Sequence, residues 1–106
     1  PPVAADSASK RQALARELFA MLIAELPQQR DQMIKAYRAA DWTTLREIAH
    51  KLRGSAAYCQ VKDLEQAAAD LETASPTASH GAIETAQQRC LDIIEDLLLT
   101  AAGAEN

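Results

Sequence analysis

One histidine, His50, stands among residue types that suit phosphoryl chemistry. If its segment is helical, two arginines and two small residues share its side of the helix: Arg46, Arg53, Gly54 and Ala57. A neutral imidazole is a nucleophile near pH 7. If a ring nitrogen takes a phosphoryl group, the added negative charge needs cations nearby. The pattern therefore predicts a phosphate-accepting histidine displayed between guanidinium groups.

The residues that follow His50 supply the cations and the room that such chemistry needs. We expect Lys51 and Arg53 to stabilise a phosphoryl group on the imidazole. Gly54 needs another reason, because glycine inside a helix costs about 1 kcal/mol relative to alanine. Close approach of a partner's backbone is one such reason. From the spacing alone, the alternative is a solvent-exposed histidine with unrelated neighbours and a tolerated glycine.

Five segments carry apolar residues at helical spacing, and His50 lies on the third. The first is predicted from about residue 7 or 9 to Leu26, with one apolar stripe: Leu14, Leu18, Met21, Leu22 and Leu26. Pro27 is expected to end this helix and to open the second one, because proline suits a first turn. The second helix carries Met33, Ile34 and Tyr37.

The third helix should hold His50 on its outer face. Asp41 is a suitable N-cap for a helix that begins at Trp42 and ends near residues 59–60. Its predicted inward residues are Leu45, Ile48, Ala49, Leu52 and Ala56, and His50 lies about 155° from the centre of that stripe. A fourth helix is predicted over about 61–73. A loop over 75–81 precedes a last helix from about Ala82.

These elements predict an all-α fold, an up-down antiparallel four-helix bundle with an additional N-terminal helix, since short connections favour antiparallel neighbours. At 106 residues the chain is one domain. We expect residues 1–8 to be a flexible linker, residues 9–102 to form the bundle, and residues 103–106 to be a flexible C-terminus. The absence of a starting Met leads us to expect a segment cut from a longer protein.

Composition and charge exclude several classes of function. A net charge of -4 argues against a nucleic-acid binder. No apolar run approaches the roughly 18 residues that span a bilayer. Residues 30–53 carry six basic and three acidic side chains, whereas residues 63–106 carry nine acidic and one basic. The positive middle is expected to attract an acidic partner, although plain solvated helix faces would give the same pattern. Cys59 and Cys90 lack metal-ligand spacing, which indicates buried free thiols.

The run Ala49-His50-Lys51-Leu52-Arg53-Gly54-Ser55-Ala56 resembles the phosphorylation motif of histidine-containing phosphotransfer (HPt) domains, His-x-Leu-Lys-Gly-Ser/Ala. The resemblance covers about residues 10–100 and is strongest to the C-terminal modules of hybrid sensor kinases of the BarA/GacS type. It implies that His50 is the phosphoacceptor and that Gly54 lets the partner approach. The surrounding residues would stabilise phosphate or dock the partner: Arg46, Lys51, Arg53 and Ala57.

The chain departs from that motif at three positions. Arg53 stands where the family usually has lysine, and Gln60 stands where it usually has glycine at the turn after the site helix. Glu72 stands where some members have a glutamine that hydrogen-bonds the site histidine. Because a carboxylate beside phosphohistidine is unfavourable, we assign Glu72 no role from the sequence.

The resemblance also implies a place in a phosphorelay. His50 would take a phosphoryl group from the receiver domain of a parent hybrid kinase and pass it to the receiver of a response regulator. The chain would need no cofactor, since Mg²⁺ belongs to the receiver's acidic pocket. We expect a monomer at the cytoplasmic end of an inner-membrane kinase, with no direct contact to membrane or nucleic acid.

Two other functions remain to be weighed. In the phosphoacceptor domain of a histidine kinase an acidic residue directly follows the histidine, whereas here Lys51 follows it. No glycine-rich nucleotide-binding segment is present, so ATP-dependent kinase activity is not expected. The remaining alternative is a non-catalytic helical docking module in which His50 is incidental.

Overall fold

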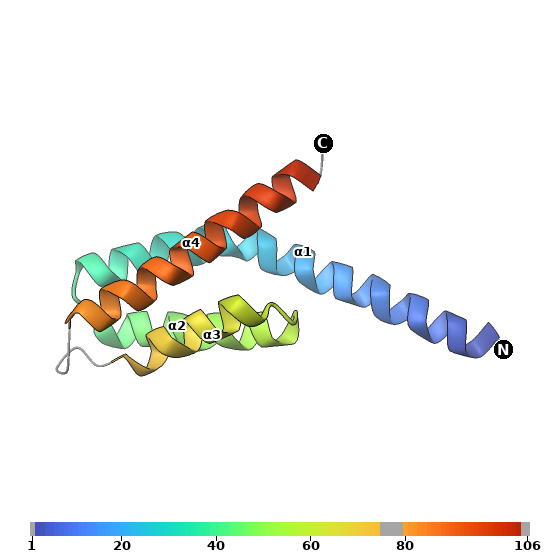
Figure 1. Ribbon diagram of the computed structural model, residues 1–106, viewed down its shortest axis with the longest axis horizontal. Coiled ribbons are helices and arrows are strands. Elements are labelled where there is room, and N and C mark those ends of the chain that lie inside the picture. The colour runs from blue at the N-terminus through green and yellow to red at the C-terminus, as the bar shows by residue number, and fades with distance from the viewer. Residues whose placement is uncertain (1, 75–79, 105–106) are drawn as a thin grey trace.

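The computed structural model describes residues 2–74 and 80–104, and nearly all of them are helical. The four helices are α1 (Pro2–Arg38), α2 (Trp42–Tyr58), α3 (Lys62–Thr73) and α4 (His80–Ala104). Helices α2 and α3 form an antiparallel hairpin that packs against α1 and α4 (Figure 1). The predicted all-α helical bundle is confirmed. Of the predicted loop at 75–81, residues 75–79 lie outside the described residues. Residues 80–81 are helical instead, because α4 begins two residues earlier than expected.

The predicted break at Pro27 is wrong, because α1 runs through it as one helix of 37 residues. Proline inside a helix removes a backbone hydrogen bond and costs about 3 kcal/mol. The buried residues before and after it nevertheless stay in helical phase, three and four positions apart: Leu22, Leu26, Gln29, Met33 and Ala36. Burial of one stripe on both sides of Pro27 therefore favours a continuous helix. The predicted additional N-terminal helix corresponds to the first part of α1. This helix begins at Pro2, inside residues 1–8, which were expected to be a flexible linker.

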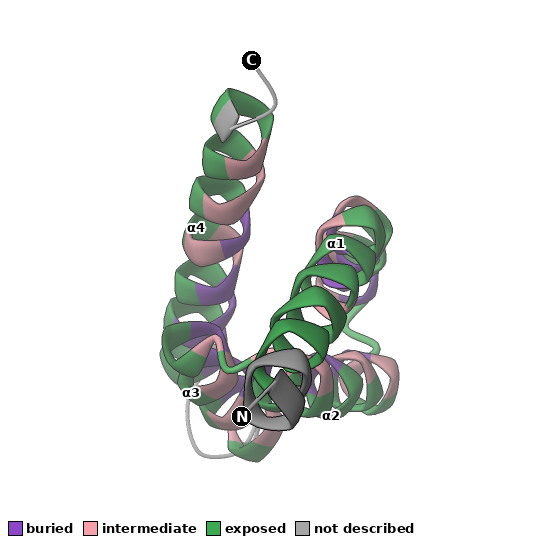
Figure 2. Ribbon diagram, turned by 90° about the vertical axis from the view of Figure 1, so that its right-hand side faces the viewer, coloured by how far each residue is buried: buried purple, intermediate pink, exposed green. Residues whose placement is uncertain are grey.

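The N-terminal part of α1 extends beyond the rest of the bundle (Figure 1), and Figure 2 shows the coloured part of this extension as mostly exposed. Its 37 residues span about 55 Å at 1.5 Å per residue, whereas the 17 residues of α2 span about 25 Å. The predicted apolar stripe is consequently exposed at two positions, since Leu14 is 53% exposed and Met21 is 59% exposed. Leu22 and Leu26 are buried as expected, because they lie where α1 meets the other helices.

Helix α2 presents one apolar face to the core, which leaves its opposite face to solvent. Four of the five residues predicted to point inward are buried, and the fifth, Ile48, is half-buried. The core also takes apolar side chains from the neighbouring helices, among them Leu26, Met33, Leu64, Leu71, Cys90 and Ile94. Tyr37 and Trp42 pack edge to face at the rim, with ring centroids 5.8 Å apart.

Asp41 is the N-cap of α2, as the sequence predicts. Its carboxylate accepts a hydrogen bond from the Thr44 backbone N–H at 3.2 Å and from the Thr44 hydroxyl at 2.6 Å. These bonds, the hydroxyl first and the backbone second, lower the pKa of Asp41 from its ordinary value of 3.8. The cap therefore contributes to the free energy of unfolding at pH values above 3.8. It loses this contribution as the pH falls through the lowered pKa of Asp41.

Helices α1 and α2 end in the same way, with a non-glycine residue in the left-handed region. After α1, Ala40 has φ 54°, and after α2, Gln60 has φ 61°. At the second of these ends, the Gln60 N–H donates to the Ala57 carbonyl and the Val61 N–H donates to the Ala56 carbonyl. This is a Schellman arrangement, in which glycine is the preferred residue at the left-handed position. Gln60 stands where the resembled family usually has glycine, and the backbone is therefore strained at this residue.

Gln60→Gly should raise the free energy of unfolding by about 1 kcal/mol, because glycine adopts positive φ without the steric cost that other residues incur. In a domain of this size that corresponds to a rise in Tm of roughly 4–8 °C. Thermal and urea unfolding would measure it. Gln32→Gly, at an exposed position inside α1, is the matched control and should lower stability by about 1 kcal/mol. A loss of stability in both variants would contradict the assignment of strain to the turn.

Candidate functional site

His50 lies on the solvent-facing side of α2, with its side chain 67% exposed. The predicted neighbours share this face: Arg53 is 41% exposed, and Gly54 and Ala57 are exposed. Arg46 and Lys51 are also exposed, and the structure gives neither an ion pair with another described residue. The outward orientation that the helical pattern predicts for His50 is confirmed.

Helix α3 adds a residue that was assigned no role in the sequence analysis. Glu72 lies opposite His50, and its Oε2 forms a hydrogen bond with His50 Nδ1. Its other oxygen, Oε1, forms an ion pair with Nη1 of Arg53 at 2.9 Å. The Glu72 side chain is only 15% exposed. One carboxylate therefore connects the imidazole and the guanidinium across the α2–α3 hairpin.

The contact with Glu72 determines which nitrogen of His50 is available for chemistry. A carboxylate accepts hydrogen bonds, so the proton of the neutral imidazole belongs on Nδ1. The lone pair is then on Nε2, at the other side of the ring. Because the His50 side chain is largely exposed, this nitrogen is accessible to a partner. The site can thus present one unprotonated ring nitrogen in a fixed orientation, with Arg53 beside it.

Gly54 is not required by packing within the domain. A Cβ added at this position would meet no atom within 4 Å apart from those of its own helix and its chain neighbours. It borders a hollow over α2 and α3, lined by Arg53, Gly54, Ala57, Lys62, Glu65, Gln66 and Ala69. The absence of a side chain therefore leaves the surface beside Arg53 unobstructed, without any benefit to packing in the core.

Comparison with known proteins identifies the family to which this arrangement belongs. A family model described as Hpt domain matches residues 17–103. The chain is an Hpt domain. Hpt domains take part in histidine phosphotransfer in phosphorelays and interact with receiver domains. No curated protein and no solved structure matches the chain.

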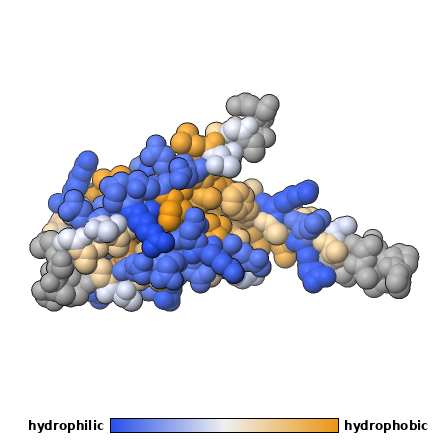
Figure 3. All heavy atoms as spheres, viewed as in Figure 1, coloured by the Kyte–Doolittle hydropathy of each residue, from blue (hydrophilic) through white to orange (hydrophobic). Residues whose placement is uncertain are grey.

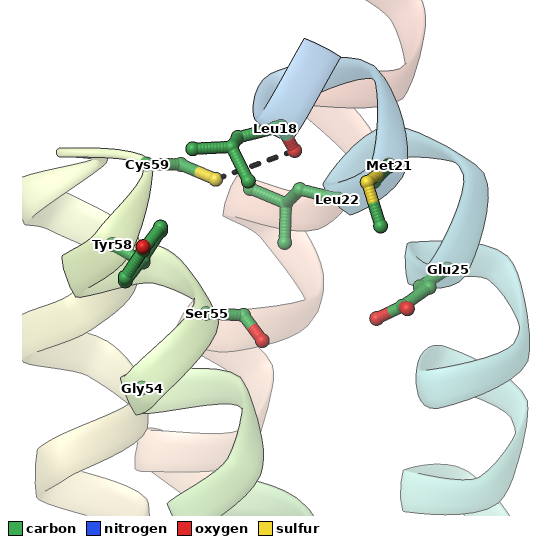
Figure 4. A pocket seen from close by; sticks show the side chains of 8 residues that line it. All are labelled: Leu18, Met21, Leu22, Glu25, Gly54, Ser55, Tyr58 and Cys59. Carbon is green, nitrogen blue, oxygen red and sulfur yellow. Dashed lines mark hydrogen bonds between the residues drawn. The ribbon is translucent and has the colours of Figure 1, made fainter. Parts of the chain in front are cut away.

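A groove between α1 and α2 lies on the other side of Gly54 in this Hpt domain (Figure 4). It is lined mostly by apolar side chains: Leu18, Met21, Leu22, Glu25, Gly54, Ser55, Tyr58 and Cys59. Met21 and Tyr58 are 59% and 72% exposed. Figure 3 shows apolar surface between the polar sides of the molecule near the point where α1 leaves the bundle. The sequence analysis missed this groove, because the apolar stripe on α1 does not by itself show which of its residues face a neighbouring helix.

The two thiols of the Hpt domain are free, as predicted. Cys59 is half-buried and donates a hydrogen bond to the Leu18 carbonyl at 3.4 Å, and burial raises the pKa of its thiol. Cys90 is buried in the core, and burial raises its pKa to about 12. Both thiols therefore stay protonated at neutral pH and are poor nucleophiles.

The described residues hold no group of three or more histidine, cysteine, aspartate or glutamate side chains that could bind a metal ion. In residues 2–74 and 80–104, no helix is both long and apolar enough to cross a membrane.

Proposed function

We propose that His50 accepts a phosphoryl group from the phospho-aspartate of one receiver domain and passes it to the aspartate of another. The observation that carries this proposal is the largely exposed imidazole whose Nδ1 is held by Glu72, which leaves Nε2 as the nitrogen for chemistry. Membership of the Hpt family supports the reaction class. The residue that performs it is our assignment.

The transfer balances without a further reactant. The Nε2 lone pair attacks the phosphorus of the acyl phosphate, an N–P bond forms, and the P–O bond to the aspartate breaks. The electron pair of that bond stays on the departing carboxylate, and the Nδ1 proton remains hydrogen-bonded to Glu72. In the second transfer a receiver carboxylate attacks phosphorus, and the electrons of the N–P bond return to Nε2. Such transfers depend mainly on positioning and on charge stabilisation.

Charge on the two sides of the proposed interface is complementary. Arg53 and Lys51 bring positive charge to the His50 face, whereas a receiver presents an acidic pocket with Mg²⁺. We expect the metal to remain with the receiver. Cations beside His50 attract the acidic partner and offset the charge of the phosphoryl group.

The groove between α1 and α2 gives the receiver domain a second, apolar contact. It is continuous with the His50 face, because Gly54 and Ser55 of α2 line it. Its exposed apolar members, Met21 and Tyr58, would lose water contact when a receiver covers them. A partner placed over Gly54 would then contact both the groove and the imidazole.

The wider setting follows from the motif resemblance. We propose that the donor is the receiver of a parent hybrid kinase, of the BarA/GacS type, and that the acceptor is a response regulator. The domain would act as a monomer in the cytoplasm, tethered to an inner-membrane sensor. Sedimentation equilibrium over a wide concentration range tests whether the domain is a monomer. A tight dimer that buries His50 would contradict this proposal.

The function is tested by transfer of label from a receiver domain phosphorylated with a radioactive small-molecule phosphodonor. We expect the chain to take up label that is stable to base and labile to acid, as a phosphohistidine is. Mass spectrometry should locate the label on His50. Binding of the receiver without any transfer of label would instead favour a docking module, and label on another residue would exclude His50.

Met21→Glu should weaken transfer at least fivefold, mainly through KM for the phosphorylated receiver, because a charge in the apolar groove opposes docking. Met21 is largely exposed, so the Tm should stay within 2–3 °C of the parent. Leu99→Glu is the matched control, since Leu99 is 65% exposed on α4. Equal transfer by both variants and the parent would remove the groove from the interface.

A further inference from the structure

The carboxylate of Glu72 poses an electrostatic problem at the site described above. It lies against the same ring that, under the proposed function, carries a phosphoryl group. Two negative groups on opposite sides of one imidazole repel each other, and Glu72 is too little exposed for solvent to screen this repulsion fully. While Nδ1 keeps its proton, the phosphorylated ring is cationic and offsets one negative charge, but the phosphoryl group brings about two. A further positive charge is therefore favourable wherever Glu72 keeps its contact with His50.

We infer that Arg53 is a positioning residue for Glu72, and that its charge allows a carboxylate to hold His50 during transfer. This inference rests on the proposed function. Arg53 Nη1 forms an ion pair with Glu72 Oε1 at 2.9 Å, while the other oxygen of Glu72 hydrogen-bonds His50 Nδ1. Each carboxylate oxygen thus has its own partner, one charged and one on the imidazole. The guanidinium neutralises the carboxylate before any phosphoryl group arrives.

The chemistry of arginine suits it to this double task. Its planar guanidinium carries five N–H donors and is always protonated, so one donor can stay on Glu72 while others face the phosphoryl group. Arg53 is 41% exposed, which leaves part of the guanidinium accessible beside His50. The structure shows no ion pair between Lys51 and Glu72, so Lys51 would act on the phosphoryl group without holding the carboxylate. The two cations should therefore respond differently when Glu72 loses its charge.

A double-mutant cycle separates these roles. We expect Arg53→Gln to lower the rate of label uptake at least tenfold, because it leaves Glu72 unneutralised. In the Glu72→Gln background, where the amide oxygen still accepts the Nδ1 proton, the same change should cost less than threefold. Lys51→Gln is the control and should cost the same factor in both backgrounds. Equal losses for Arg53→Gln in the two backgrounds would overturn the inference and leave Arg53 as a phosphate contact only.

A spectroscopic measurement tests the positioning without any transfer. The ¹⁵N chemical shifts of the His50 ring in the unphosphorylated domain report which nitrogen carries the proton. We expect the Nδ1–H tautomer to dominate in the parent and in Glu72→Gln, and to lose that dominance in Glu72→Ala and in Arg53→Gln. An unchanged tautomer in Arg53→Gln would also overturn the inference. Failure of the parent to accept label would instead overturn the proposed function. The tautomer measurement uses the unphosphorylated domain and does not depend on that function.

Discussion

His50→Gln should abolish phosphoryl uptake, with a rate at least a thousandfold below that of the parent. The variant lacks the nucleophilic nitrogen, and an amide forms no phosphoramidate under the same conditions. The fold should be unaffected, because the side chain is 67% exposed and belongs to no part of the core. Glutamine can also donate a hydrogen bond to Glu72, so the carboxylate need not lose its partner. Label uptake and Tm, measured on the same preparation, give both quantities.

The chain contains its own control, since His80 is its other histidine. His80→Gln should take up label at the rate of the parent. Uptake by His50→Gln at a rate within tenfold of the parent would show that phosphate resides elsewhere. Loss of uptake in both variants would indicate that the assay responds to something other than the site.

Gly54→Leu should stabilise the domain and yet impair transfer at least tenfold. Glycine inside a helix costs close to 1 kcal/mol relative to alanine, and leucine is nearly as favourable as alanine. The first atom of the new side chain meets no obstacle, because a Cβ at Gly54 would have no atom within 4 Å apart from those of its own helix and its chain neighbours. The free energy of unfolding should therefore rise by about 0.8 kcal/mol. A leucine side chain beside Arg53 would at the same time stand between the domain and its partner.

Gly103→Leu is the matched control for this experiment. Gly103 also lies in a helix, α4, and a Cβ there would likewise meet nothing within 4 Å. It should lack the effect on transfer, because it lies near the C-terminal end of α4, and Figure 1 shows that end of the helix pointing away from the α2–α3 hairpin. Gly54→Ala should give a smaller loss than Gly54→Leu. Full transfer by Gly54→Leu would mean that the partner does not approach this turn.

A rise in stability together with a loss of transfer in Gly54→Leu would explain why the chain has glycine at position 54. A residue that weakens its own helix and serves no packing within the domain is explained by a contact outside it. The same reasoning distinguishes Gly54 from position 60. A glycine at position 60 would relieve strain, but the chain has glutamine there. Local stability therefore does not account for where this chain places its glycines.

Features that depend on one helix at a time follow from the sequence alone. The periodicity of α2 places Leu45, Ala49 and Leu52 inward and His50 outward, because a helix repeats every 3.6 residues whatever surrounds it. The Asp41 cap and the left-handed Gln60 follow from the same local rules. The family motif lies within one such helix, so the residues 49–56 sufficed to recognise it.

Features that depend on how helices meet were decided by the tertiary structure. Pro27 predicts a break from local rules, but burial on both sides of it keeps α1 continuous. The groove beside Gly54 exists because α1 is longer than the helices it packs against, and no local pattern encodes that difference. Most of all, Arg53 and Glu72 each depart from the motif that the chain resembles, and their contact is visible only once α2 and α3 are paired. A carboxylate judged unfavourable by itself becomes compatible with His50 through a guanidinium 19 positions away in the sequence, because electrostatic energy depends on distance in space.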